Sequence, residues 1–82
     1  MNYFNEKIEI KELSKDTYFF KNNRGKRTLK INDKVTFYFE DEKITKKIKG
    51  FDIHEENNEL VFDFCYESEN DIRWSYVSSI LY

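Results

Sequence analysis

The chain has 82 residues, a formal net charge of −2 and a single cysteine. A chain of this length buries one hydrophobic core, so we expect residues 1–82 to form one domain rather than two. One cysteine excludes an internal disulfide, and no apolar run reaches the ~18 residues of a membrane span, so we expect a cytoplasmic protein with no membrane partner.

The composition favours β-strands. Alanine, the best helix former, is absent, whereas the chain has eight Ile, eight Phe, six Tyr and one Trp. Such β-branched and aromatic residues are enriched in strands. Phe, Tyr, Ile, Asn and Lys, whose codons are AT-rich, supply 41 residues, which indicates a low-GC bacterium or one of its phages or plasmids as the source.

Charge is distributed unevenly along the chain. Residues 1–30 contain eight basic and four acidic residues, whereas residues 50–82 contain one basic and eight acidic residues. Residues 31–49 are nearly balanced, with five basic and four acidic residues. This polarity is the feature of the sequence that is most informative about function.

The first segment of the chain has the pattern of a strand. Within residues 3–13, Ile8 and Ile10 alternate with charged residues, as in a half-buried strand. The spacing of Phe4 and Ile8 leaves a short helix open as the alternative.

A hairpin is predicted next. Residues 17–21 and 27–31 are strand-like, and they flank an Asn-Asn-Arg-Gly sequence that tolerates positive φ. We expect a β-hairpin with a basic tip, which completes the N-terminal part of the domain, residues 1–31.

The clearest strand is residues 35–40, where Val35, Phe37 and Phe39 share one face. Residues 43–53 form the next strand, and its apolar positions change from even to odd at Gly50. A glycine at such a phase change is typical of a β-bulge or a sharp bend. The positions expected to be buried on this bent strand are Ile44, Ile48, Phe51 and Ile53.

Two more alternating segments follow. Residues 59–66 place Leu60, Phe62, Phe64 and Tyr66 on one face, and residues 72–76 place Ile72, Trp74 and Tyr76 on one face. Residues 77–82 fit either a short turn of helix or a closing strand. Five or six short strands separated by polar turns predict an all-β fold, either a small antiparallel barrel or a strongly curved sheet.

Part of this pattern resembles a known fold. The stretch 32–82, with its NDKVTFYF strand, IKGFDI bend, LVFDFCY strand and closing WSYVSSIL, is similar to SH3-like small β-barrels. The resemblance implies a barrel-like region from 32 to 82, and it implies no particular function.

The acidic residues of the second half are the first candidate binding surface. Clustered carboxylates on a small sheet can imitate the phosphates of a nucleic acid and occupy a basic groove of a protein. Aromatic side chains can anchor such a contact, although a core position is the preferred interpretation of Trp74, whereas Tyr38 lies opposite the core face of its strand. The candidate residues are Glu55, Glu56, Glu59, Glu67, Glu69, Asp71, Tyr38 and Trp74.

The basic hairpin is the second candidate. Five cations surround a flexible glycine with no acidic residue between them, as in loops that contact phosphates. The overall pI near 5.4 weighs against a dedicated nucleic-acid binder. The candidate residues are Lys21, Arg24, Lys26, Arg27 and Lys30.

The sequence contains only weak indications of catalysis or metal binding. His54 is the only histidine, and the sequence has no nucleophile at a recognisable catalytic spacing from it. Cys65 has no positive neighbour in sequence and is expected to act as a small hydrophobe. The carboxylates match no calcium loop or zinc motif, so we expect no enzyme, no metal and no cofactor.

Size, charge and composition together favour a protein-binding module that docks onto a larger host protein. Small phage inhibitors of nucleic-acid-processing proteins, the anti-CRISPR proteins among them, are similar in size and charge. A nucleic-acid-binding regulator that uses the hairpin is the alternative, and a small ribonuclease is a third. Opposite charges also permit self-association, including a homodimer.

Overall fold

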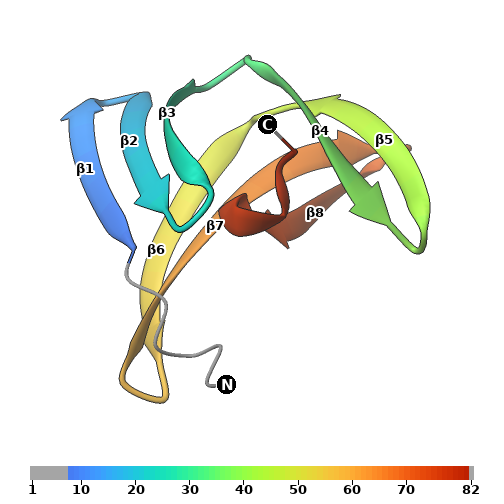
Figure 1. The fold of residues 1–82 in the computed structure, drawn as a ribbon. Coiled ribbons are helices and arrows are strands. Elements are labelled where there is room, and N and C mark those ends of the chain that lie inside the picture. Colours follow the sequence, from blue (N-terminus) through green and yellow to red (C-terminus); the bar gives the residue numbers. More distant parts are fainter. Residues whose placement is uncertain (1–7, 82) are drawn as a thin grey trace.

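The computed structural model describes residues 8–81, and it is all-β apart from one short turn (Figure 1). The described residues contain eight strands and no α-helix. The strands are β1 (Glu9–Ser14), β2 (Thr17–Asn22), β3 (Gly25–Lys30), β4 (Lys34–Phe39), β5 (Glu42–Lys47), β6 (Gly50–Glu56), β7 (Glu59–Ser68) and β8 (Asp71–Tyr76), followed by the 3-10 turn η2 (Val77–Ser79).

The strands pair as three small antiparallel sheets, β1-β2-β3, β4-β5 and β6-β7-β8. Consecutive strands are neighbours in every sheet, so each connection is a short hairpin turn. Among the described residues the hydrogen-bonded ladders do not close into a barrel. The expected all-β antiparallel architecture is confirmed, whereas residues 8–81 form eight strands rather than the five or six expected.

The sheets curve around a single core (Figure 1). At its centre the Phe37 ring packs edge-on against Phe64 and Tyr66, with ring centroids 5.1 and 5.0 Å apart. All three sheets and the C-terminal segment contribute side chains, so residues 1–31 and 32–82 do not have separate cores. The core residues are Phe20, Leu29, Val35, Phe37, Ile48, Phe62, Phe64, Tyr66, Val77 and Ile80.

The N-terminal strand and the hairpin after it agree with the sequence pattern. Of the expected segment 3–13, β1 covers residues from Glu9 onward as a strand, and residues 3–7 lie outside the described part. β2 and β3 pair from Thr17 with Lys30 to Asn22 with Gly25. Gly25 has a φ of 140°, a conformation that only glycine adopts without strain.

The phase change at Gly50 coincides with a break between two strands. β5 ends at Lys47, and β6 begins at Gly50, directly opposite Cys65 on β7. A Cβ atom at position 50 would lie 3.1 Å from the Cys65 sulfur, so glycine permits the close approach of the two strands. The prediction that Ile53 is buried is wrong, because its side chain is exposed. It lies in the β6-β7 hairpin, whose end projects away from the other strands (Figure 1).

The strand β8 presents its apolar side to solvent. The register places Ser75 opposite Phe64 and Arg73 opposite Tyr66, so these polar residues occupy the core-facing side. The guanidinium of Arg73 lies 5.1 Å from the centre of the Phe39 ring. The preferred interpretation of Trp74 as a core residue is therefore wrong, because its side chain lies on the solvent side of β8 and is exposed.

The C-terminal segment joins different sheets. Arg24 donates a hydrogen bond to the carbonyl of Ser78, and Arg27 donates one of 3.1 Å to the carbonyl of Leu81. The backbone N–H of Leu81 donates to the Thr36 carbonyl at 2.8 Å. Within residues 8–81 there is no helix long and apolar enough to cross a membrane.

Candidate functional site

The solvent side of the β6-β7-β8 sheet carries most of the carboxylates of the second half. In an antiparallel sheet, directly opposed residues point to the same face, so the register identifies its members. Five of these residues are acidic and none is Lys or Arg. We call this surface the acidic face, and its residues are Asp52, His54, Glu56, Glu59, Val61, Asp63, Cys65, Glu67, Ile72, Trp74 and Tyr76.

Three large apolar side chains line the β8 edge of the acidic face. Ile72, Trp74 and Tyr76 have exposed fractions of 49%, 53% and 58%. They stand at alternate positions of one strand, so they form a continuous row. An exposed apolar patch rimmed by polar residues is typical of an interaction site, and Trp and Tyr are enriched in protein-binding hot spots.

A histidine–carboxylate cluster lies at the centre of the acidic face. Asp52 and Asp63 are directly opposite each other on β6 and β7, and His54 is two residues along β6. His54 Nδ1 is 2.8 Å from Asp52 Oδ2 and 4.0 Å from Asp63 Oδ2. Its other nitrogen, Nε2, is 3.5 Å from Glu56 Oε2. Both ring nitrogens therefore face carboxylates.

This environment changes the ionisation of two groups. The pKa of His54 is raised above its ordinary 6.5, chiefly by the hydrogen bond to Asp52, with Glu56 and the charge of Asp63 acting in the same direction. Burial raises the pKa of the Asp63 carboxyl above 3.8, and the charges of Asp52 and Glu56 add to this, whereas the charge of His54 opposes it. The cluster is an environment that favours a positive charge at its centre.

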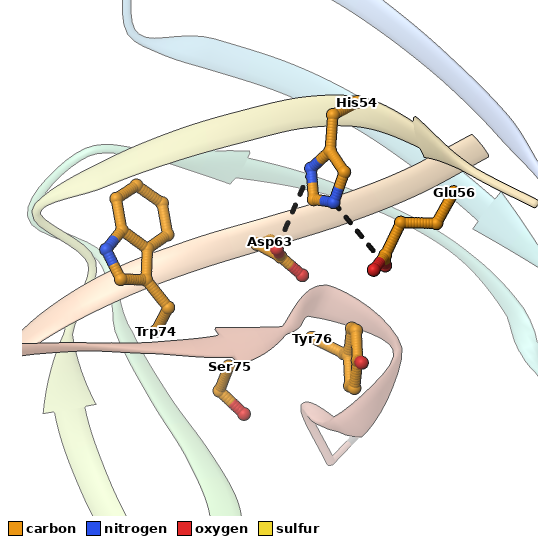
Figure 2. A pocket seen from close by; sticks show the side chains of 6 residues that line it. All are labelled: His54, Glu56, Asp63, Trp74, Ser75 and Tyr76. Carbon is orange, nitrogen blue, oxygen red and sulfur yellow. Dashed lines mark ion pairs between the residues drawn. The ribbon is translucent and has the colours of Figure 1, made fainter.

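Beside the cluster the surface is hollowed. The hollow has a volume of about 340 Å³ and is open to solvent. Figure 2 shows His54 between Asp63 and Glu56, with Trp74 on one side and Tyr76 on the other. Ser75 completes the lining. Carboxylates between aromatic side chains are suited to a cationic guest.

The structure brings together only some of the acidic and aromatic candidates. Glu56, Glu59, Glu67 and Trp74 share the acidic face. The others lie elsewhere: Glu55 is on the opposite side of β6, Glu69 is in the β7-β8 turn, Asp71 begins β8 on the core-facing side, and Tyr38 is on β4.

Tyr38 has basic rather than acidic neighbours. It is exposed, as its strand parity predicts, and it is paired with Lys43 of β5. The same face of the β4-β5 sheet carries Lys34 and Lys47, which are paired with each other. Tyr38 is therefore not part of the acidic face.

The basic candidate residues also lie in two different environments. Lys21, Lys26 and Lys30 point to the solvent side of the β1-β2-β3 sheet, together with Lys11. We call this side of the sheet the lysine face, which also carries Thr28 and Glu9, the latter paired with Lys11 at 3.6 Å. Arg24 and Arg27 instead bond to the carbonyls of the C-terminal segment, so their contacts are structural.

Sequence reasoning missed the partnership of His54 with Asp52 and Asp63. The signal was present as the Asp-x-His-x-Glu pattern of residues 52–56, which places three polar side chains on one face of a strand. Asp63 joins them only when the hairpin register is known, and that depends on the turn being Asn57-Asn58. Cys65 is buried, and burial raises the pKa of its thiol, as expected for a small hydrophobe.

Comparison with protein-family models, with curated proteins and with solved structures finds no significant match to this chain.

Proposed function

We propose that the chain is a non-enzymatic binding module that docks onto a basic surface of a larger protein through the acidic face. The observation that carries the proposal is the row of Ile72, Trp74 and Tyr76 beside five carboxylates, with no Lys or Arg on the same face. Buried aromatic anchors supply most of the affinity of a protein interface, and complementary charge supplies orientation and association rate.

The chemistry of the face defines the partner. Carboxylates that repeat along neighbouring strands resemble a row of phosphates, so the matching surface is a basic groove such as those that hold nucleic acid. We therefore propose a cytoplasmic nucleic-acid-processing protein of the host as the partner. The chain would act as a mobile-element-encoded inhibitor that occupies the groove, similar in size and charge to anti-CRISPR proteins.

Site-specific photo-crosslinking in cells of the host tests this proposal. A photoreactive amino acid replaces Ile72 on the acidic face in one variant and Thr28 on the lysine face in the other, since both are exposed strand positions. We expect a protein adduct from position 72 that excess wild-type chain competes away, and none from position 28. Competed adducts from position 28 alone would refute the proposal.

A nucleic-acid-binding role is the second candidate, supported by the lysine face. Four lysines on one side of a three-stranded sheet can track a phosphate backbone. This role predicts direct DNA or RNA affinity that falls steeply with salt and is lost on Lys21→Glu and Lys26→Glu. An inhibitor of the proposed kind has no such affinity.

We also propose that the fold is related to the SH3-like small barrels. It is supported by hairpins that curve around one core and by a 3-10 turn near the end of the chain. A third role, ribonuclease activity, would require His54, and an RNA-cleavage assay of wild type and His54→Ala tests it.

A further inference from the structure

The histidine–carboxylate cluster has donor atoms at the spacing of a metal site. One ligand atom each from Asp52, His54 and Asp63 lies within 4.8 Å of the others. An ion about 2.1 Å from each donor holds them roughly 3 to 4 Å apart. Asp52 is well exposed, so its side chain can make the small movement that brings all three donors onto one ion.

The second nitrogen of His54 is already held by an acceptor. Nδ1 is hydrogen-bonded to Asp52. Figure 2 shows the two other ion pairs of the ring, from Nδ1 to Asp63 and from Nε2 to Glu56, the latter at 3.5 Å. In protein metal sites, a ligating histidine commonly donates its other N–H to a carboxylate, which fixes the tautomer and the ring orientation. Glu56 therefore orients His54 so that Nδ1 is the coordinating atom.

Asp63 is the least exposed of the three donor residues. Its side chain has an exposed fraction of only 17%. Its Oδ2 atom faces His54, whereas its Oδ1 atom is buried and has no hydrogen-bond partner among the described residues, which is costly for a carboxylate. Asp63 also lies directly opposite Asp52, and like charges in that position are destabilising.

A bound dication would neutralise more of the negative charge of the cluster than a proton on His54 does. Three carboxylates beside an imidazolium keep an excess of two negative charges, whereas a dication beside a neutral imidazole leaves one. An imidazole with carboxylates suits first-row transition ions, whereas calcium selects oxygen ligands alone. Cys65 is buried with a raised pKa, so it supplies no thiolate.

We propose that Asp52, His54 and Asp63 form a binding site for a divalent first-row transition-metal ion, with Glu56 as the outer carboxylate that orients His54. The hollow beside the cluster leaves the remaining coordination positions open to water or to a side chain of a partner. This site does not depend on the protein-docking function proposed above.

Calorimetry with zinc chloride tests the site, using untagged, metal-free protein. We expect one zinc ion per chain for wild type, and an affinity reduced by at least about tenfold in His54→Gln and in Asp63→Asn. The control variants are Glu55→Gln, on the opposite side of β6, and Cys65→Ala. Both are expected to bind zinc like wild type.

Nuclear magnetic resonance identifies the coordinating atom. His54 is the only histidine, so its two nitrogen signals are unambiguous, and zinc should shift Nδ1 while Nε2 stays protonated. If Asp63→Asn fails to fold, as judged by circular dichroism, Asp52→Asn replaces it, since Asp52 is exposed. Absence of saturable zinc binding by wild type, undiminished binding by His54→Gln, or equally tight binding of calcium would each overturn the proposal.

Discussion

His54 is the side chain whose charge most affects the acidic face. Its imidazole faces the carboxylates of Asp52 and Glu56 on its own strand and Asp63 on the neighbouring strand, while Tyr76 lines the adjacent hollow. Because these carboxylates favour the imidazolium, the folded-state pKa of His54 is above 6.5. The charge of the face therefore changes at a pH above the ordinary pKa of a histidine.

This pKa shift predicts a pH-dependent stability in metal-free buffer. A raised folded-state pKa contributes stability that is fully present below pH 6.5 and is lost as the pH rises through the raised value. We expect urea denaturation to show this decline in wild type and not in His54→Gln. A His54 pKa at or below 6.5, measured by NMR titration, would contradict the prediction.

Gly50 is a second position of interest, because one added side-chain carbon there should change the stability of the fold. A methyl group there would lie 3.1 Å from the sulfur of Cys65, which is buried. We expect Gly50→Ala to lower the free energy of unfolding by about 1 kcal/mol, as overpacking does. In a Cys65→Ala background the added cost should disappear, and an equal cost in both backgrounds would show that the contact is not its cause.

Among the elements, the β6-β7 hairpin is the one that builds the site. Its turn residues Asn57 and Asn58 have φ values of 52° and 67°, which set the two-residue turn that places Asp63 opposite Asp52. A shift of one residue would move Asp63 to the other face. The turn therefore determines the composition of the cluster.

Substitutions in this turn test its role. We expect Asn58→Ala to lower the free energy of unfolding by about 1 kcal/mol, since alanine is disfavoured at positive φ, and Asn58→Gly to maintain or raise it. Asn70 is a matched control, because it is exposed in the β7-β8 turn without a positive φ. Thermal or urea denaturation of the three variants measures the effect, and an equal loss in Asn58→Ala and Asn70→Ala would refute it.

Strand positions could be predicted from the sequence better than strand faces. The parity of β4 correctly places Val35 and Phe37 in the core and Tyr38 outside it. The same reasoning fails to orient β8, because alternation shows that a strand is amphipathic and does not identify which side meets the core. Val77 and Ile80 fill the core near the end of the chain, which leaves Trp74 on the solvent side.

For the whole molecule, the charge gradient of the sequence becomes a separation between sheets. The solvent sides of β1-β2-β3 and β4-β5 carry lysines, and the solvent side of β6-β7-β8 carries carboxylates. The gradient could be seen in the sequence. The addition of Asp63 to His54 and Asp52 could not, because it requires the register of β6 with β7, and the sequence does not specify which two residues form the centre of their turn.

Trp74 and Tyr38 provide the most direct test of the proposed docking surface. Both are exposed aromatic residues, with exposed fractions of 53% and 57%, and they lie on faces of opposite charge. For the partner captured by crosslinking, we expect Trp74→Ala to weaken the measured affinity by about 30-fold or more and Tyr38→Ala by less than about threefold. An affinity unchanged by Trp74→Ala and reduced by Tyr38→Ala would contradict a docking role for the acidic face.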